Sequence, residues 1–320
     1  MNGVLTAMGE ILIDFLPIQS GEHTTGFTMH AGGAPFNVAV GMARLGQPAA
    51  FASKLAADLF GRYLRAYAEA EGVDTRFLIP SEAQSTLAFV AMENGEPAYA
   101  FYGEGAADTL LTIDDLSYEF FTETRILHFG SISLLRGSTP DAVLAAAERL
   151  KGRALLSFDP NLRPGLVRDE RAYRALLARA FALADVVKLS SVDLDWLAPG
   201  RAPRDVVAEL AAQGPGLVVV TQGGAGVLAA HQGREWQVPA FPVRVVDTVG
   251  AGDAFSAGLL TGLAERGGYT RAALEALSEA DFVSALRFAG AVAALTCSHA
   301  GADPPRRAEV AAFLAARETP

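Results

Sequence analysis

The chain has 320 residues, of which 51% are hydrophobic and 19% are charged, and its formal net charge is −10 at pH 7. This apolar content suffices for a large buried core and excludes an intrinsically disordered chain. The acidic balance argues against binding to nucleic acid or to a membrane surface, because both are anionic. We therefore expect neither among the partners of this protein.

Cysteine usage and the N-terminus indicate a cytoplasmic protein. Cys297 is the only cysteine, so an internal disulfide cannot form, and a reducing compartment fits. The first residues, Met1–Leu5, lack the basic-then-apolar order of a signal peptide. No uninterrupted apolar run reaches the ~20 residues that a membrane span requires.

The N-terminal segment offers a first group of candidate binding residues. Asp14 ends an apolar run, a position where α/β sheets commonly present binding groups. Gly32 and Gly33 permit close approach of the backbone to a ligand, and Asn37 is placed to cap a helix over residues 38–45. From the residues alone, a glycine turn followed by an Asn cap explains this segment equally well.

Two strand patterns, over residues 86–92 and 98–102, flank the pair Asn94-Gly95. This pair is a strong hairpin signal. Phe101 lies on the second of these strands, where it either covers a ligand or belongs to an apolar sheet face.

From about residue 124 onward, short apolar runs alternate with helical patterns, as in βαβ units with a parallel sheet. Arg163 follows one such strand in a loop bracketed by Pro160 and Pro164, where it could clamp an anion or pair with surface carboxylates. The strand ending at Ser190 contains Lys188. Ser190 is placed to cap the helix that follows it.

Residues 217–221 form the most strand-like run of the chain, and a turn containing Gly223 and Gly226 follows. Glycine-rich turns after buried strands are routine, so this turn alone is a weak sign of nucleotide binding. No G-x-x-x-x-G-K-[ST] phosphate loop occurs anywhere in the chain.

The segment around residue 250 is the most informative. A β-like run over residues 243–246 leads into Gly250, Ala251 and Gly252, and a helical pattern follows. Small residues let backbone N–H groups at a helix start approach an anion, and Asp253 adds a carboxylate beside them. Phosphoryl transfer to a hydroxyl needs both an anion hole and a base, and this segment offers both. The alternative is a glycine turn with Asp in the first helical turn.

The nine residues Asp-Thr-Val-Gly-Ala-Gly-Asp-Ala-Phe at 247–255 resemble the C-terminal signature of the ribokinase-like (PfkB) carbohydrate kinases. Gly-Gly-Ala-Pro-Phe-Asn-Val-Ala at 32–39 resembles their N-terminal signature. The resemblance extends over essentially the whole chain. It implies one α/β domain over residues 1–320, a three-layer α/β/α sandwich with a mostly parallel central sheet. A small β lid would come from about 11–31 and 86–103.

The resemblance also implies an ATP-dependent sugar kinase of the fructokinase type that uses Mg²⁺, with K⁺ as an option, and that forms a homodimer through the lid strands. Asp253 would be the base, with the amides of Gly250, Ala251 and Gly252 stabilising the transferred charge. The remaining roles that it implies are sugar contacts by Asp14, Gly32, Gly33, Asn37, Phe101 and Arg163, nucleotide contacts by Lys188, Ser190, Thr221, Gly223 and Gly226, a Mg²⁺ role for Asp193, directly or through water, and a monovalent-cation role for Asp247.

Several alternatives stay open at this point. Arg163 suits an acidic sugar as well as fructose, so 2-keto-3-deoxygluconate kinase is the close second reading; ribokinase and nucleoside kinase are more distant. Gly103 stands where fructokinases usually carry arginine after the aromatic pair. A nucleotide-dependent dehydrogenase is disfavoured, because Phe255 replaces the third glycine of its fingerprint. A non-catalytic sugar-binding protein would not need Asp253.

Overall fold

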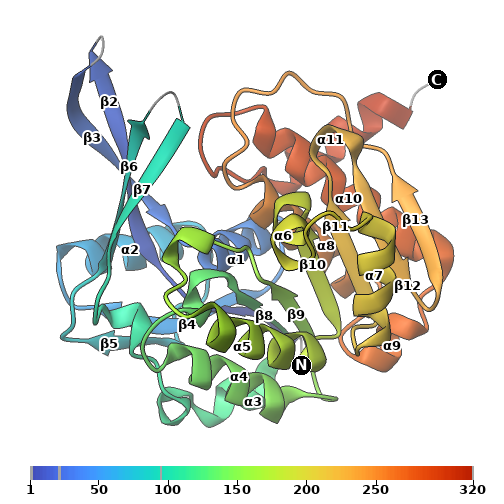
Figure 1. Ribbon diagram of the computed structural model, residues 1–320, viewed down its shortest axis with the longest axis horizontal. Coiled ribbons are helices and arrows are strands. Elements are labelled where there is room, and N and C mark those ends of the chain that lie inside the picture. Colours follow the sequence, from blue (N-terminus) through green and yellow to red (C-terminus); the bar gives the residue numbers. More distant parts are fainter. Residues whose placement is uncertain (1–2, 21–22, 94–95, 319–320) are drawn as a thin grey trace.

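The computed structural model describes residues 3–20, 23–93 and 96–318, and a nine-stranded sheet runs through its centre (Figure 1). The strand order is β13-β12-β11-β10-β9-β8-β1-β4-β5. All neighbours from β5 to β11 pair in parallel, and β12 and β13 add an antiparallel hairpin at one edge. The strands are β1 (Val4–Met8), β4 (Ala49–Ala56), β5 (Leu78–Ser81), β8 (Thr124–Gly130), β9 (Leu155–Asp159), β10 (Val186–Ser190), β11 (Leu217–Thr221), β12 (Val227–His231) and β13 (Arg234–Val238).

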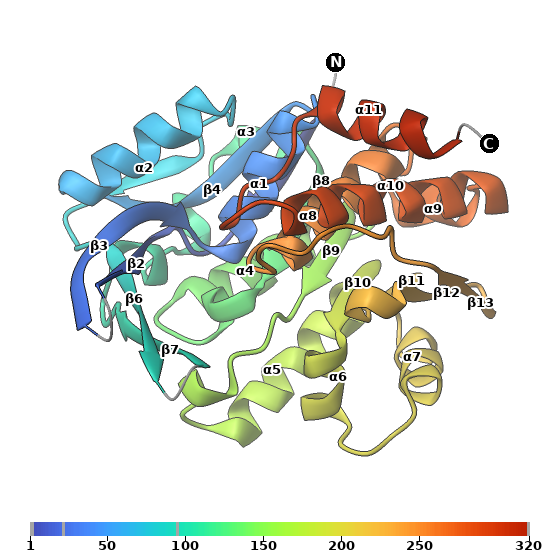
Figure 2. The same cartoon turned by 90° about the horizontal axis from the view of Figure 1, so that it is seen from above.

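Helices cover both faces of this sheet, as the view from above shows (Figure 2). One layer consists of α1 (Ala34–Arg44), α2 (Leu59–Ala70), α8 (Ala251–Ala264), α9 (Arg271–Glu275), α10 (Glu279–Cys297) and α11 (Arg307–Glu318). The other consists of α3 (Tyr118–Glu123), α4 (Thr139–Leu150), α5 (Glu170–Leu183), α6 (Ser191–Leu197) and α7 (Pro203–Ala212). The predicted three-layer α/β/α sandwich is therefore confirmed.

The apolar runs of the central strands follow from burial on both faces. In β11, Leu217 and Val219 belong to the core beneath α8 and α10, whereas Val218 and Val220 belong to the core beneath the other helix layer. Successive side chains of a strand point to opposite faces, so a strand covered on both sides needs a continuous apolar run.

A second, four-stranded sheet rises from the sandwich as a lid (Figure 1). Its order is β3-β2-β6-β7, formed by β2 (Leu12–Ser20), β3 (His23–Gly32), β6 (Thr86–Glu93) and β7 (Glu96–Tyr102). These strands lie in the two segments predicted for the lid. β6 and β7 pair antiparallel up to Glu93 and Glu96, as the hairpin pattern predicts; Asn94-Gly95 itself lies outside the described residues.

Three local predictions were wrong. Residues 243–246 form no strand, and Val245 and Val246 are exposed, because no neighbouring strand lies beside them to pair with. Helix α1 begins at Ala34, with Pro35 in its first turn and Gly33 as its N-cap. Asn37 is therefore inside the helix and does not cap it. Asp14 lies within lid strand β2 and not at an end of the central sheet.

Helix α10 has the length and hydropathy that a membrane span requires, by composition alone. Its inner residues, among them Phe282, Leu286 and Val292, are buried in the same core as α8. An apolar helix enclosed in the core of a large domain shows the same composition.

Candidate active site

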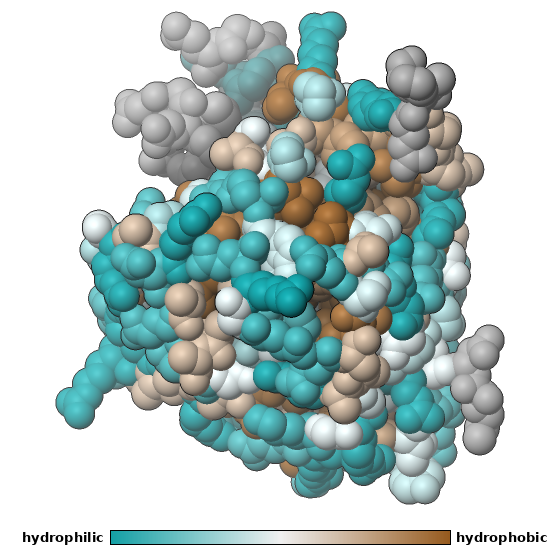
Figure 3. Space-filling model, turned by 90° about the vertical axis from the view of Figure 1, so that its right-hand side faces the viewer, coloured by the Kyte–Doolittle hydropathy of each residue, from teal (hydrophilic) through white to brown (hydrophobic). Residues whose placement is uncertain are grey.

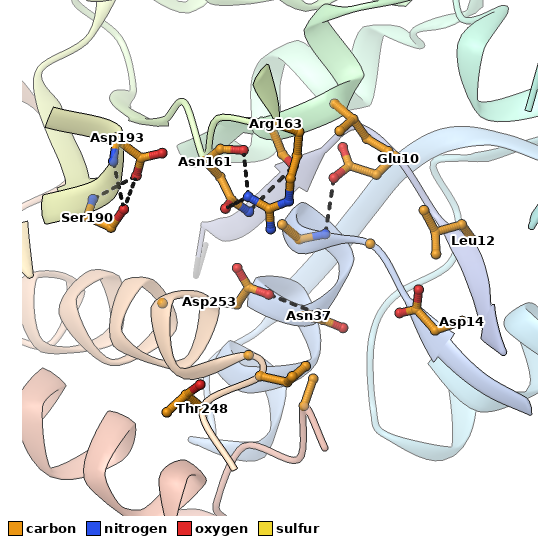
Figure 4. A pocket seen from close by; sticks show the side chains of 18 of the residues that line it. Glu10, Leu12, Asp14, Asn37, Asn161, Arg163, Ser190, Asp193, Thr248 and Asp253 are labelled. Atoms are coloured by element: carbon orange, nitrogen blue, oxygen red, sulfur yellow. Dashed lines mark hydrogen bonds between the residues drawn. The ribbon is translucent and has the colours of Figure 1, made fainter. Parts of the chain in front are cut away.

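A cavity of about 340 Å³ lies where the carboxyl ends of β8, β9 and β10 face the lid and the N-termini of α1 and α8 (Figure 4). Crevices at the carboxyl ends of parallel strands are the usual binding sites of open α/β sheets. The structure brings into this one cavity most of the residues predicted for catalysis and sugar binding, namely Asp14, Gly33, Asn37, Phe101, Arg163, Gly250, Gly252 and Asp253.

Asp253, in the first turn of α8, occupies the centre of the cavity (Figure 4). Its Oδ2 accepts a hydrogen bond of 2.9 Å from Nδ2 of Asn37. Desolvation by the surrounding protein raises the pKa of Asp253 to about 6, although Asn37 and the charge of Lys188 act in the opposite direction. A carboxylate with a pKa near neutrality is suited to accept a proton from a hydroxyl.

The start of α8 has the backbone of an anion hole. Gly250 is the N-cap in the left-handed region (φ 74°), and a Cβ there would lie 2.6 Å from that of Ala302, so only glycine fits. Gly252 is the second helical residue, and its N–H has no partner within the helix. The N–H of Ala251, predicted to join them, instead donates to the carbonyl oxygen of Thr248.

A buried ion pair lies beneath this turn. Nζ of Lys188 on β10 is 2.8 Å from Oδ2 of Asp159 at the end of β9. A Cβ on Gly252 would lie 2.8 Å from Nζ, so the ammonium group lies directly under the helix start. Burial opposes the charge on Lys188, but neighbouring carboxylates outweigh it and raise the pKa, so the lysine is protonated. It adds positive charge where an anion would bind.

The lid provides the opposite wall. Asp14 on β2 and Phe101 on β7 are both registered with Ala88 on β6, so their side chains share the lid face that lines the cavity. Desolvation raises the pKa of Asp14 to about 6, which Arg163 partly offsets. A Cβ on Gly32 would lie 2.1 Å from Oδ2 of Asp14, so this glycine makes room for the carboxylate without lining the cavity itself.

Arg163 lies at the rim of the cavity, in the loop after β9 (Figure 4). Its Nη1 donates to Oδ1 of Asn161 at 2.7 Å, so the guanidinium folds back on its own loop. The side chain is otherwise exposed and can turn toward a ligand. Its contact with a substrate remains a prediction.

The carboxylate of Asp193 is engaged within the protein. Its Oδ2 accepts bonds from the N–H and Oγ of Ser190, and its Oδ1 accepts one of 2.7 Å from the N–H of Leu162. Ser190 caps α6 in return, which confirms the predicted cap and completes a capping box. Any role of Asp193 toward Mg²⁺ stays a prediction, and the geometry favours contact through water over direct ligation.

A second, mainly apolar cavity of about 230 Å³ adjoins the first. Thr221, Thr248 and Gly252 line both, so the two spaces meet at the start of α8. Gly223 and Gly226, predicted to contact a nucleotide, line only the second cavity.

Hydrophobic side chains gather in the upper part of the molecular face that β13 and the C-terminal helices form (Figure 3). The valines at 243 and 245 line this cavity, which explains their apolar character without a strand.

Comparison with known proteins identifies the family. The model of the pfkB family of carbohydrate kinases matches residues 4–308. This chain belongs to that family. The kinase is 38% identical to fructokinase-1 of Zea mays over 316 residues, 96% of each chain.

Solved structures agree with this assignment. A fructokinase with bound ATP from Xylella fastidiosa matches the kinase with a TM-score of 0.92 and 33% identity over 99% of both chains. A fructokinase double mutant from Vibrio cholerae O395, solved with fructose, ADP and potassium ion bound, matches with a TM-score of 0.86 and 30% identity over 98% of both chains.

Asp247 fastens the segment in front of the anion hole of the kinase. Its Oδ1 accepts from the N–H of Val249 and its Oδ2 from that of Gly301 at 2.8 Å. Burial would raise the pKa of Asp247, but these backbone donors and that of Thr248 outweigh it and lower the pKa. The carboxylate therefore stays ionised, as the predicted cation role requires, although that role itself stays untested.

Sequence reasoning missed Glu10. This residue is buried, and its carboxylate accepts bonds from the backbone N–H of Ala34 at the start of α1 and from the N–H and Oγ of Ser133. Desolvation raises its pKa to about 7. It therefore joins the glycine turn of α1 to the loop after β8. The only sign of a functional role in the sequence was that Glu10 is a charged residue between two apolar runs.

Ser131 and Asn161 were also missed. They follow neighbouring strands β8 and β9, line the cavity, and have left-handed backbones with φ of 57° and 38°. Residues other than glycine adopt this region at an energetic cost, and such residues cluster at functional sites. No sequence pattern indicates that Ser131 and Asn161 have left-handed backbones.

Proposed function

We propose that this kinase transfers the γ-phosphoryl group of ATP to the 6-hydroxyl of fructose, giving fructose 6-phosphate and ADP. The observation that carries the proposal is the position of Asp253. Its carboxylate, held by Asn37, lies beside the start of α8, where the polar cavity opens into the apolar one. The fructokinases to which the kinase is similar support the choice of sugar.

In the proposed reaction, Asp253 accepts the proton of the sugar hydroxyl as its oxygen attacks the γ-phosphorus. The bond between that phosphorus and the β,γ-bridging oxygen breaks, and ADP leaves. The N–H groups of Gly250 and Gly252, with the ammonium group of Lys188 beneath them, stabilise the charge on the transferred group. The apolar cavity would hold the adenine.

The described residues contain no cluster of three or more His, Cys, Asp or Glu that could hold a metal ion. Mg²⁺ often binds through substrate phosphates, water and one or two carboxylates, so the site fits an ion that arrives with the nucleotide. Asp193 would contact it through water, and the ion would neutralise phosphate charge. Asp247 would border K⁺, as the potassium-bound fructokinase of Vibrio cholerae suggests.

A homodimer through the lid is part of the proposal. The lid face opposite Asp14 carries an aromatic cluster in which Phe15 stacks on Phe89 at 4.6 Å and Phe27 packs edge-on against Phe89 at 5.2 Å. Phe27 and Tyr102 are 43% and 65% exposed on this lid. A second copy of the chain would cover these two side chains. Analytical sedimentation of the Phe27→Asp variant should show monomers where the wild type shows dimers.

We also propose that the enzyme is located in the cytoplasm.

The second candidate, 2-keto-3-deoxygluconate, is favoured by one observation. Arg163 is an exposed cation at the cavity rim that could pair with a sugar carboxylate. ADP release with Mg·ATP should be compared across fructose, 2-keto-3-deoxygluconate, ribose and adenosine. A preference for fructose supports the proposal; a preference for the keto-acid replaces it.

The mechanism is tested with Asp253→Asn. Turnover should fall about 10²- to 10⁴-fold, as expected for loss of a general base, while fructose binding by calorimetry is retained. Asp141→Asn, at an exposed position of α4, is the matched control. Full activity of Asp253→Asn would refute the role of this residue.

A further inference from the structure

A small side cavity of about 20 Å³ branches from the main one behind the lid. It shares Phe101 and Ile132 with the main cavity, and Asp253 does not line it. We infer that this side cavity is a subsite for one hydroxyl of the sugar, at the end remote from the phosphorylated oxygen, and that Arg136 determines specificity there. The inference rests on the proposed function.

The size of the side cavity limits its occupant. A space of at least ~10–15 Å³ accepts one water-sized group, and this cavity is little larger. It therefore has room for a single hydroxyl group and not for a second sugar ring. Because Asp253 is absent from its walls, the group that enters cannot be the one that receives the phosphate.

Arg136 is the cation of this cavity. It follows the turn of residues 131–134 and is partly buried. Within the described part of the chain, no hydrogen bond or ion pair occupies its guanidinium group. A partly buried arginine with unused donors is suited to bind a polar ligand oxygen, because its N–H groups otherwise lose water without replacement.

Asp108 supplies the complementary acceptor. It is buried, and its Oδ1 accepts a hydrogen bond of 2.5 Å from Oγ1 of Thr86. Arg136 lies close enough to stabilise its charge. A hydroxyl group is both donor and acceptor, so it can donate to Asp108 while it accepts from Arg136. A carboxylate cannot donate and would face Asp108 with like charge, so the subsite favours a neutral ketose over a sugar acid.

Gly103 lines the side cavity but contributes no side chain to it. A Cβ there would lie 2.9 Å from Oγ1 of Thr86, so Thr86 occupies the room that a side chain at position 103 would need. The cation therefore enters from the loop after β8 and not from the lid strand. Because Phe101 of the lid and Ile132 of that loop line both cavities, a sugar in the main cavity can extend into the subsite.

The test compares Arg136→Ala with the wild type on fructose and on 1-deoxyfructose, which lacks the hydroxyl farthest from the 6-position. A hydrogen bond to a charged group predicts that wild-type kcat/KM falls about 10- to 100-fold on the deoxy sugar. On fructose, kcat/KM of Arg136→Ala should fall by the same factor relative to the wild type. Replacing fructose by 1-deoxyfructose should then lower kcat/KM of this variant hardly at all. Arg136→Gln keeps the N–H donors of a side-chain amide. Its kcat/KM on fructose should therefore lie between those of the wild type and Arg136→Ala.

Arg171→Ala, an exposed arginine of α5 that lines none of these cavities, is the control and should match the wild type. Melting temperature and KM for ATP should be unchanged in the Arg136 variants. Equal losses on both sugars, or no loss on fructose, would overturn the subsite alone. Failure of the wild type to phosphorylate fructose would overturn the proposed function and the subsite with it.

Discussion

Nδ2 of Asn37 in α1 donates to Oδ2 of Asp253 in α8 over 2.9 Å and across 216 positions of sequence. The two residues belong to the two sequence segments that most resemble the family signatures. Their contact explains why both segments are needed in one site: the first fixes the orientation of the carboxylate that the second provides. We therefore expect Asn37 to act on the reaction through Asp253, in addition to its predicted contact with the sugar.

Asn37→Ala should lower kcat about 10- to 100-fold, because the carboxylate loses its orientation. The hydrogen bond from Asn37 also lowers the pKa of Asp253. Its loss should therefore move the acid limb of the pH–rate profile to higher pH, an effect that damage elsewhere in the fold would not produce. Gln47→Ala, which removes an amide side chain beyond the end of α1, is the control; an unshifted acid limb would contradict the positioning role.

The rate should fall on acidification. Asp253 must be ionised to act as a base, and burial raises its pKa to about 6. Asp14 has a pKa of about 6 for the same reason. Below that pH both carboxyls become protonated, so log kcat/KM for the sugar should fall with a slope between one and two. In Asp14→Asn the limiting slope should be one, and a profile that stays flat down to pH about 5 would contradict both assignments.

The two glycines of the anion hole should respond differently to alanine. Gly252→Ala presses on the flexible end of Lys188, so the protein should fold normally while kcat drops about 10- to 100-fold. Gly250→Ala strains a left-handed residue against Ala302 and should lower the free energy of unfolding by about 1–3 kcal/mol.

Chemical denaturation and steady-state kinetics measure the two effects. Gly165→Ala, where a Cβ meets open space and φ is not positive, is the control and should change neither. An unchanged kcat in Gly252→Ala would mean that the position of the lysine does not matter.

Cys297 should report nucleotide binding. Its side chain is partly exposed and lines the apolar cavity, and burial raises the pKa of the thiol. Mg·ATP at about ten times its Kd should slow alkylation by a maleimide roughly tenfold, whereas fructose alone should give no protection. Mass spectrometry of the labelled protein measures the rate, and Cys297→Ser provides the unlabelled control. Equal rates with and without nucleotide would place the adenine elsewhere.

The parts of the site that the sequence predicted depend on local geometry. Gly250 is required by the left-handed backbone of a single turn, and Ser190 and Asp193 form a capping box within four residues. Such patterns can be read without knowing the fold. The parallel strands were equally readable, because burial on both faces makes their apolar runs continuous.

The parts that were missed depend on contacts between distant segments. Glu10 binds Ser133, which lies 123 positions away, and Arg136 lines one small cavity together with Asp108 and Thr86, which come from other segments of the chain. The β-like pattern of residues 243–246 was misleading because a strand also needs a neighbour, which only the fold supplies. The start of α1 was mistaken although Pro35 signals a first turn.

The carboxylate of Asp193 closes the first turn of α6 and, at the same time, holds the N–H of Leu162, next to Arg163. Fraying of a short helix is a frequent local opening that needs far less free energy than global unfolding. Each time the first turn of α6 opens, the loop of Arg163 loses its anchor. One carboxylate thereby couples the first turn of α6 to the loop that carries Arg163.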